Sequence, residues 1–284
     1  MLRSSNPILS KRDAFTPAAP GHGQNPYGQN AYGQSPYARP GYQGYPQGQD
    51  QQYTPQDNRA QGLMTFDDVV TKTAVVMAVL VAAAAVSWNL LPPLGLQFPA
   101  MVVSALVGFV VVLLVSFRRV VSPALVITYA AVEGIFIGCI SQVFESIYPG
   151  IVAQAVIGTF FAAGATLAAY KFFNIRVTAK FQKIVVISTI AFAAMMLVNF
   201  IFSLAGHGGL RGGIAGPVSM FSYLISAVAI VLAVLNLVLD FDYIERGVAM
   251  GAPARESWRG AFGLTVTMVW LYVELLRLLS YLRR

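Results

Sequence analysis

Charged residues are scarce in this chain. Asp, Glu, Lys and Arg make up 11% of its 284 residues, whereas about 25% is usual for a soluble domain. Hydrophobic residues account for 56% of the chain. Cysteine is scarcer still, because Cys139 stands alone and excludes an intramolecular disulfide. Its position within an apolar run is typical of a small packing residue. A soluble fold held together by disulfides is therefore excluded.

Catalytic motifs are also missing. The two histidines, His22 and His207, lie in a polar tail and in a glycine-rich connector. The sequence contains no H-E-x-x-H, no G-x-S-x-G and no Walker-type P-loop. Membrane aspartyl proteases use aspartates on two facing helices, but the aspartates of the apolar runs are confined to Asp240 and Asp242. We therefore predict a protein that is not an enzyme and that has no resident cofactor or structural metal.

Long apolar runs dominate the chain after residue 70. A helix needs about 20 apolar residues to cross the hydrocarbon core of a bilayer, which is about 30 Å thick. Clusters of Pro and Gly separate the runs, as chain reversals require. The predicted spans are 72–91, 97–117, 121–142, 151–171, 184–205, 217–240 and 261–281. The expected fold is an all-α integral membrane protein with a seven-helix transmembrane domain over residues 65–284.

Residues 1–64 differ in kind from the rest of the chain. Tyr27, Tyr32, Tyr37 and Tyr42 recur every five residues in a background of Gly, Gln and Pro. Such a segment has too few aliphatic side chains to offset the entropy of ordering, so it is predicted to be a disordered tail. Periodic tyrosines can act as weak stickers for protein partners. A solvated tail without partners is the alternative.

The distribution of Lys and Arg predicts the orientation in the membrane. In a soluble protein the net charge of +7 would favour nucleic acid as a partner, but here the basic residues lie mostly in the tail and the connectors, so no nucleic-acid partner is expected. A cytoplasmic N-terminus gathers most of the connector charges on one side. The seventh run spoils this pattern, because a full crossing leaves Arg283 and Arg284 outside. It either crosses against the rule or dips in and returns. The residues gathered on the cytoplasmic side are Arg118, Arg119, Lys171, Arg176, Lys180, Lys183, Arg246, Arg255 and Arg259.

Ionisable residues within the apolar runs are candidates for function, because a charge inside a membrane is costly and is usually held by a partner or by water. Glu133 lies in the middle of the third run, where Gly134 and Gly138 permit close approach of another helix. Glu274 and Arg277 lie three residues apart in the seventh run and could form an ion pair. These charges make the seventh run the least lipid-like, so it is expected to be surrounded by the other helices.

Two aspartates end the sixth run. Asp240 and Asp242 are two residues apart, so on a helix they point in different directions and at most one faces the bundle interior. We expect Asp242 and the following Glu245 to be solvated at the cytoplasmic surface. Asp240 lies close to the predicted end of the helix, and both an interior and a surface position are open for it.

Four segments together resemble the Bax inhibitor-1/YccA (transmembrane Bax inhibitor motif) family, in the form common in actinobacteria. They are TFDDVVTKTA, TYAAVEGIFIG, LNLVLDFDYIERG and WLYVELLRLL. The resemblance covers residues 65–284. It implies a multi-pass protein of the bacterial plasma membrane with seven helices, the last enclosed by the other six.

The resemblance also implies a pH-sensitive calcium leak that is controlled by two carboxylates and latched by an arginine. Asp240 matches the carboxylate of the sixth helix, with Asp242 where the family has an amide. Glu274 matches the carboxylate of the seventh helix, as a glutamate instead of the usual aspartate. Arg118 or Arg119 is the nearest candidate for the latch.

The chemistry agrees with that implication. Two carboxylates in a medium of low dielectric constant cannot both ionise cheaply, so they share a proton. Losing that proton adds a negative charge, and oxygen ligands suit calcium. The expected partners are therefore the lipid bilayer, protons and transiently bound calcium ions. The alternative function is that of a membrane adaptor without transport activity, which recruits partners through its tail.

Overall fold

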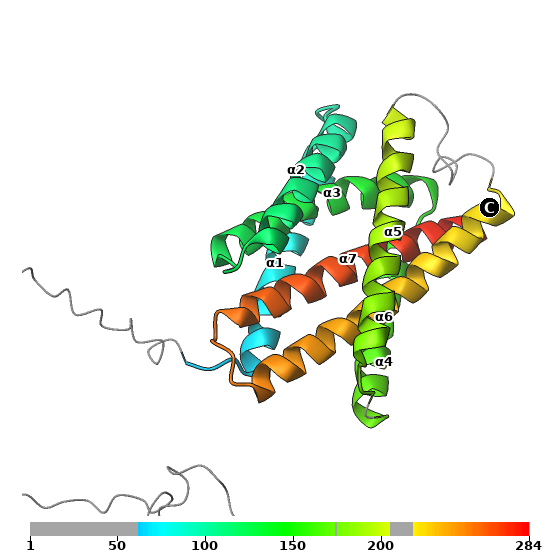
Figure 1. Ribbon diagram of the computed structural model, residues 1–284. Coiled ribbons are helices and arrows are strands. Elements are labelled where there is room, and N and C mark those ends of the chain that lie inside the picture. The colour runs from blue at the N-terminus through cyan, green and yellow to red at the C-terminus, as the bar shows by residue number, and fades with distance from the viewer. Residues whose placement is uncertain (1–61, 174, 205–217, 284) are drawn as a thin grey trace, which may run out of the picture. The chain divides into compact units, whose positions relative to one another are not determined.

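The computed structural model describes residues 62–173, 175–204 and 218–283, and these fold into seven α-helices (Figure 1). All seven are long and apolar enough to cross a membrane. The predicted seven-helix fold is therefore confirmed, while residues 1–61 of the predicted tail lie outside the described residues. The helices are α1 (Phe66–Leu90), α2 (Gln97–Phe117), α3 (Pro123–Ile147), α4 (Ile151–Phe172), α5 (Ala179–Leu204), α6 (Met220–Ala249) and α7 (Glu256–Leu282).

The sixth helix is longer than predicted. It ends at Ala249, nine residues beyond the expected limit of residue 240. The polar residues past that limit stay helical because they have partners within the bundle. Asp242 forms an ion pair with Arg246 one turn later, and Glu245 accepts a hydrogen bond from the hydroxyl of Tyr170 on α4. Asp240 therefore lies inside α6 and not at its end.

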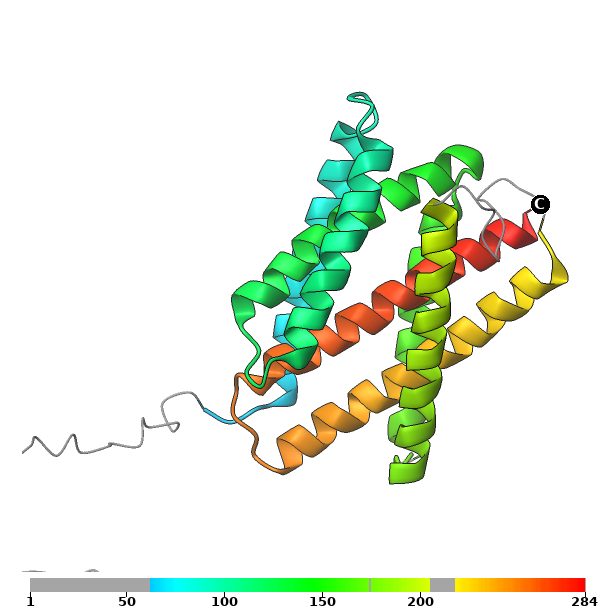
Figure 2. The ribbon, with the colours of Figure 1, turned by 45° about the horizontal axis from the view of Figure 1, so that its top comes forward.

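The seventh helix lies at the centre of the bundle. It packs against α1, α3, α4 and α6, and Figure 2 shows it running alongside α6. Side chains of the two remaining helices also reach it: Val115 of α2 packs in one cluster with Phe262, and Phe192 of α5 stacks on Trp270. No residue from Glu256 to Tyr281 is exposed. The prediction that the last helix is enclosed by the other six is confirmed.

Close packing joins α1 to α3. A Cβ atom at Gly134 would lie closer than 3.0 Å to the backbone carbonyl of Leu80, and one at Gly138 would lie closer than 3.0 Å to that of Ala84. The hydroxyl of Ser87 reaches across this contact to the carbonyl of Ile135, at 3.3 Å. Glycine at these two positions of α3 thus lets the two backbones meet, as expected from the sequence.

The connectors meet at two opposite ends of the bundle. At one end, Arg259 in the first turn of α7 donates to the carbonyl of Arg119 in the α2–α3 connector, at 2.6 Å. At the other end, Arg283 donates to the carbonyl of Pro149 in the α3–α4 connector, at 2.8 Å. These contacts show that α7 runs the full length of the bundle. The seventh run is one unbroken helix, long enough to cross a membrane, and does not fold back within the bundle.

The segment just before α1 packs onto the connector between α6 and α7. The amide of Met64 donates to the carbonyl of Ala252 at 2.7 Å, and that of Ala254 donates to Gly62 at 3.2 Å. Met64 is buried against Gly247. Thr65 then caps α1, because its hydroxyl accepts from the amide of Asp68 at 3.1 Å. Residues 62–64, predicted as part of the tail, therefore belong to the folded domain.

The two ends make the predicted orientation testable by cysteine labelling. Cys139 is 1% exposed, so the unchanged chain should take up almost no membrane-impermeant maleimide. Leu94→Cys, between α1 and α2, is expected to be labelled in intact cells. Arg119→Cys, between α2 and α3, is expected to be labelled only after the membrane is opened. The reverse pattern would show that the N-terminus is not cytoplasmic.

Candidate functional site

Asp240 faces a cavity between three helices. Its carboxylate points to α7, where the hydroxyl of Thr267 donates to it at 2.7 Å. A Cβ atom at Gly263, one turn earlier on α7, would lie 3.0 Å from the same carboxylate, so glycine there admits the carboxylate to the helix backbone. The cavity measures about 260 Å³, and Val115 and Ser116 of α2 form its opposite wall. A titratable group thus lies beside open space along the first turns of α7, toward the end of the bundle that carries the α2–α3 connector.

Arg259 lines the same cavity, near the α2–α3 connector. Its Nη2 donates to the carbonyls of Arg118 and Arg119 at 3.2 Å and 2.6 Å. Its Nε lies 3.1 Å from the carboxylate of Glu256, which also accepts from the hydroxyl of Tyr243 at 3.1 Å. A positive charge is therefore held at one end of the cavity, where it links α7 to the end of α2.

Glu133 lies on α3, beside α2 and away from the Asp240 cavity. Its carboxylate is next to Gly108 of α2, where a Cβ atom would lie 2.9 Å from it. Two contacts fix the level of α3 against α7. The rings of Tyr129 and Phe262 are 5.1 Å apart, and the hydroxyls of Ser141 and Tyr272 are 2.6 Å apart. Glu133 follows Tyr129 by one turn, which places it close to the level of Gly263 and Thr267.

Glu274 is buried, with 4% of its surface exposed, in line with the expected interior position. It follows Thr267, the neighbour of Asp240, by seven residues, which corresponds to about 10 Å along the helix axis. It also lies beyond Tyr272, past the level of Glu133. The structure therefore does not bring Glu274 beside Asp240 or Glu133. Arg277, one turn after Glu274, is partly buried.

The remaining predicted site residues lie at the end of the bundle that carries Arg259. Asp242 was expected to be solvated, but only 13% of its side chain is exposed, because it packs on α6 and pairs with Arg246. The side chains of Arg118 and Arg119 are exposed. They contribute backbone carbonyls to the cavity end, and their role as a latch stays a prediction.

Three residues of the site were not identified from the sequence as members of it. Arg259, Gly263 and Thr267 follow one another at intervals of four residues, so they share one face of α7. From the sequence, Arg259 was interpreted only as a signal for orientation in the membrane. Thr267 lies in an apolar run, where no motif indicates that a threonine belongs to a site. The signal that could have found them is this stripe of a charged, a small and a hydroxyl-bearing residue.

Comparison with known proteins agrees with the resemblance seen in the sequence. A search of curated proteins gave no match. The sequence profile of the family described as Bax inhibitor 1 like matches residues 6–284, which includes most of the tail as well as all seven helices. Given this match and the seven helices that are long and apolar enough to cross a membrane, the chain is a multi-pass membrane protein that belongs to the Bax inhibitor 1 like family.

Proposed function

We propose that the protein is a pH-sensitive leak pathway for cations, calcium in particular, in which Asp240 is the proton-sensing group. The observation that carries this proposal is the cavity of about 260 Å³ on which the Asp240 carboxylate opens, between three helices that are long and apolar enough to cross a membrane. A carboxylate within a membrane-spanning helix is costly, and such groups commonly mark a path for ions or protons. The cavity gives a cation access to it.

The charge state of Asp240 sets the direction of the pH effect. At low pH the carboxyl group is protonated and neutral, and a cation gains nothing from entering the cavity. At higher pH the carboxylate is negative, and its attraction for a divalent cation 4 Å away is about 8 kcal/mol at an effective dielectric constant of 20, before the cation's desolvation is subtracted. Cation flux should therefore rise with pH.

Weak binding of calcium at Asp240 would also favour a leak pathway over a site that stores calcium. Calcium takes about six to eight oxygen ligands in a tight site. Within residues 62–173, 175–204 and 218–283, no three His, Cys, Asp or Glu side chains are grouped as metal ligands. A cation attracted by Asp240 alone would leave quickly, as conduction requires. Glu133, next to Gly108 on the α2–α3 contact, is a second carboxylate within the bundle.

The test is calcium flux into liposomes that contain the purified protein, measured with an internal dye at a series of pH values. Asp240→Asn should lower the flux at high pH at least about tenfold, since a loss of only 1.4 kcal/mol of attraction has this effect. It should also remove the rise with pH, because an amide does not titrate. Asp67→Asn, which neutralises an exposed aspartate in the first turn of α1, is the matched control and should change neither.

Two further variants separate the competing explanations. Glu274→Gln should flatten the pH dependence only if Glu274 is the second sensing carboxylate, despite its different level on α7. Removal of residues 1–60 should leave the flux intact and keep the contacts of Met64. Wild-type pH dependence in Asp240→Asn would refute the proposed sensor. Absence of flux in the wild-type protein, together with capture of partners that depends on the tail, would favour the adaptor function.

A further inference from the structure

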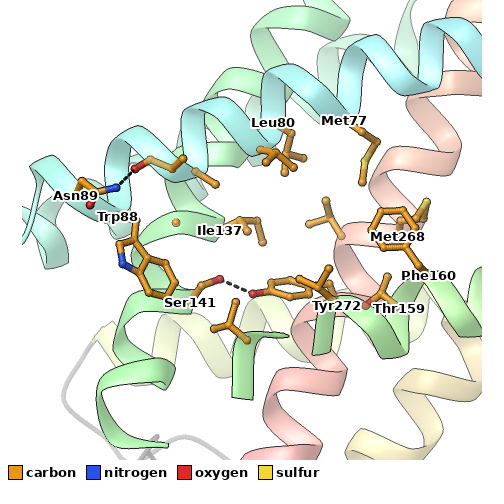
Figure 3. A pocket seen from close by; sticks show the side chains of 17 residues that line it. Met77, Leu80, Trp88, Asn89, Ile137, Ser141, Thr159, Phe160, Met268 and Tyr272 are labelled. Carbon is orange, nitrogen blue, oxygen red and sulfur yellow. Dashed lines mark hydrogen bonds between the residues drawn. The ribbon is translucent and has the colours of Figure 1, made fainter. Parts of the chain in front are cut away.

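A second cavity, unconnected with Asp240, lies between α1, α3, α4 and α7 (Figure 3). Its volume is about 370 Å³. Val81 of α1 and Phe160 of α4 form opposite edges and are 59% and 56% exposed. Helices α1 and α4 do not touch each other. The cavity is therefore a groove that opens sideways, and in a membrane-spanning bundle the medium on that side is lipid.

The groove has the length of one leaflet of the bilayer. Along α1 it extends from Met77 to Asn89, a separation of 12 residues in the sequence and about 18 Å along the helix. Half of the hydrocarbon core is about 15 Å thick. Trp88 and Asn89 lie at the end of the groove next to the end of α1, and tryptophan favours the boundary between hydrocarbon and headgroups. The groove thus runs from the headgroup level to the bilayer centre.

The hydroxyl groups of the lining and the side-chain amide of Asn89 are already engaged. At the floor, the hydroxyls of Ser141 and Tyr272 bond each other at 2.6 Å, as Figure 3 shows. The Thr159 hydroxyl donates to a carbonyl of its own helix at 2.7 Å, and the Asn89 amide does the same on α1 at 2.7 Å. A ligand here does not need to satisfy them. The lining therefore suits a hydrocarbon chain better than a polar molecule.

We propose that this groove binds one acyl chain of a phospholipid from the leaflet opposite the N-terminus, with the headgroup beside Trp88 and Asn89. The chain lies between α1 and α4, which do not touch each other, and rests on Met268 and Tyr272 of the central helix. The proposal rests on the cavity and on the membrane position of the helices, and not on the proposed cation flux.

Native mass spectrometry of the purified protein with added phosphatidylglycerol tests this proposal. The wild-type protein should retain one lipid under activation that strips the others. Ala85→Phe fills the groove from α1 and should lower the occupancy by about tenfold, because the phenyl ring displaces buried methylene groups of the lipid chain. Val86→Phe, at a neighbouring position of α1 that does not line the groove, is the matched control and should keep the lipid. Equal retention by all three proteins would show surface-bound lipid only and would overturn the proposal.

If Ala85→Phe does not fold, a fluorescence measurement tests the same lipid-binding proposal. Trp258 and Trp270 do not line the groove, so Trp258→Phe combined with Trp270→Phe leaves Trp88 as the reporter. Phospholipid with brominated chains, added to this protein in detergent, should quench Trp88 and saturate near one lipid per protein. Quenching that rises in proportion to the lipid, without saturation, would mean that no chain is held in the groove.

Discussion

Gly138→Ala is expected to destabilise the protein strongly, although it adds a single methyl group. The new Cβ atom would lie closer than 3.0 Å to the carbonyl of Ala84 and to the hydroxyl of Ser87. The carbonyl belongs to the backbone of α1 and cannot turn away, so α1 and α3 must separate. Overpacking of this kind costs about 1–3 kcal/mol and occasionally more, out of a total stability of about 5–15 kcal/mol. Gly138→Leu should prevent folding.

Gly164→Ala in α4 is the matched control, since nothing lies within 4 Å of a Cβ atom at that position. It should be neutral or stabilise the protein by about 0.5–1 kcal/mol, the advantage of alanine over glycine inside a helix. The measurement is the unfolding midpoint in detergent, followed by tryptophan fluorescence. If the two alanine variants unfold at the same midpoint, the close contact of α1 with α3 does not contribute to stability.

Arg259→Gln is expected to raise calcium flux about tenfold at every pH, if the proposed leak is correct. The guanidinium group lines the Asp240 cavity. Its repulsion of a divalent cation 8 Å away is about 4 kcal/mol at an effective dielectric constant of 20. Glu256 offsets part of that charge, at 3.1 Å, so the net effect is smaller than the Coulomb figure. Glutamine keeps an amide that can still donate to one of the two carbonyls of the α2–α3 connector.

Two controls separate the charge of Arg259 from its hydrogen bonds. Arg259→Lys keeps the charge but loses the forked geometry that reaches Arg118 and Arg119, so its flux should stay low. Arg176→Gln removes an exposed positive charge from the same end of the bundle and should have little effect. A lysine variant that leaks as much as the glutamine variant would contradict the electrostatic explanation.

The sequence predicts the seven spans well, because hydropathy depends on composition alone. It fails at the end of α6, where Asp240 and Asp242 were taken as the exit from the membrane. The helix continues because Arg246 and Tyr170 partner the carboxylates that follow, and Tyr170 comes from a helix 75 residues away along the chain. Arg246 is a neighbour of Asp242 within the same helix, four residues along the sequence, but Tyr170 becomes a neighbour of Glu245 only in the folded bundle.

The candidate site was predicted in part for the same reason. Burial of Glu274 follows from its position in an apolar run, because every side of an enclosed helix is covered. Which residues of α7 lie beside Asp240 depends on how far α6 and α7 are displaced along each other. Thr267 and Gly263 meet Asp240, and one helical turn of displacement would have chosen different residues. Periodicity within one helix carries no information about that displacement.

The central position of α7 has a consequence for biosynthesis. The helix around which the others pack is the last of the seven to leave the ribosome. While it is still being made, the six earlier segments have no common centre, and side chains such as Phe262 and Tyr272 are not yet available to cover their inner faces. Until then α1, α2 and α3 can already pack on one another, whereas α6 lacks the helix that it contacts most extensively. A chain that stops before Glu256 would therefore leave α6 separated from the unit of α1, α2 and α3, because α7 is the helix that joins them most extensively.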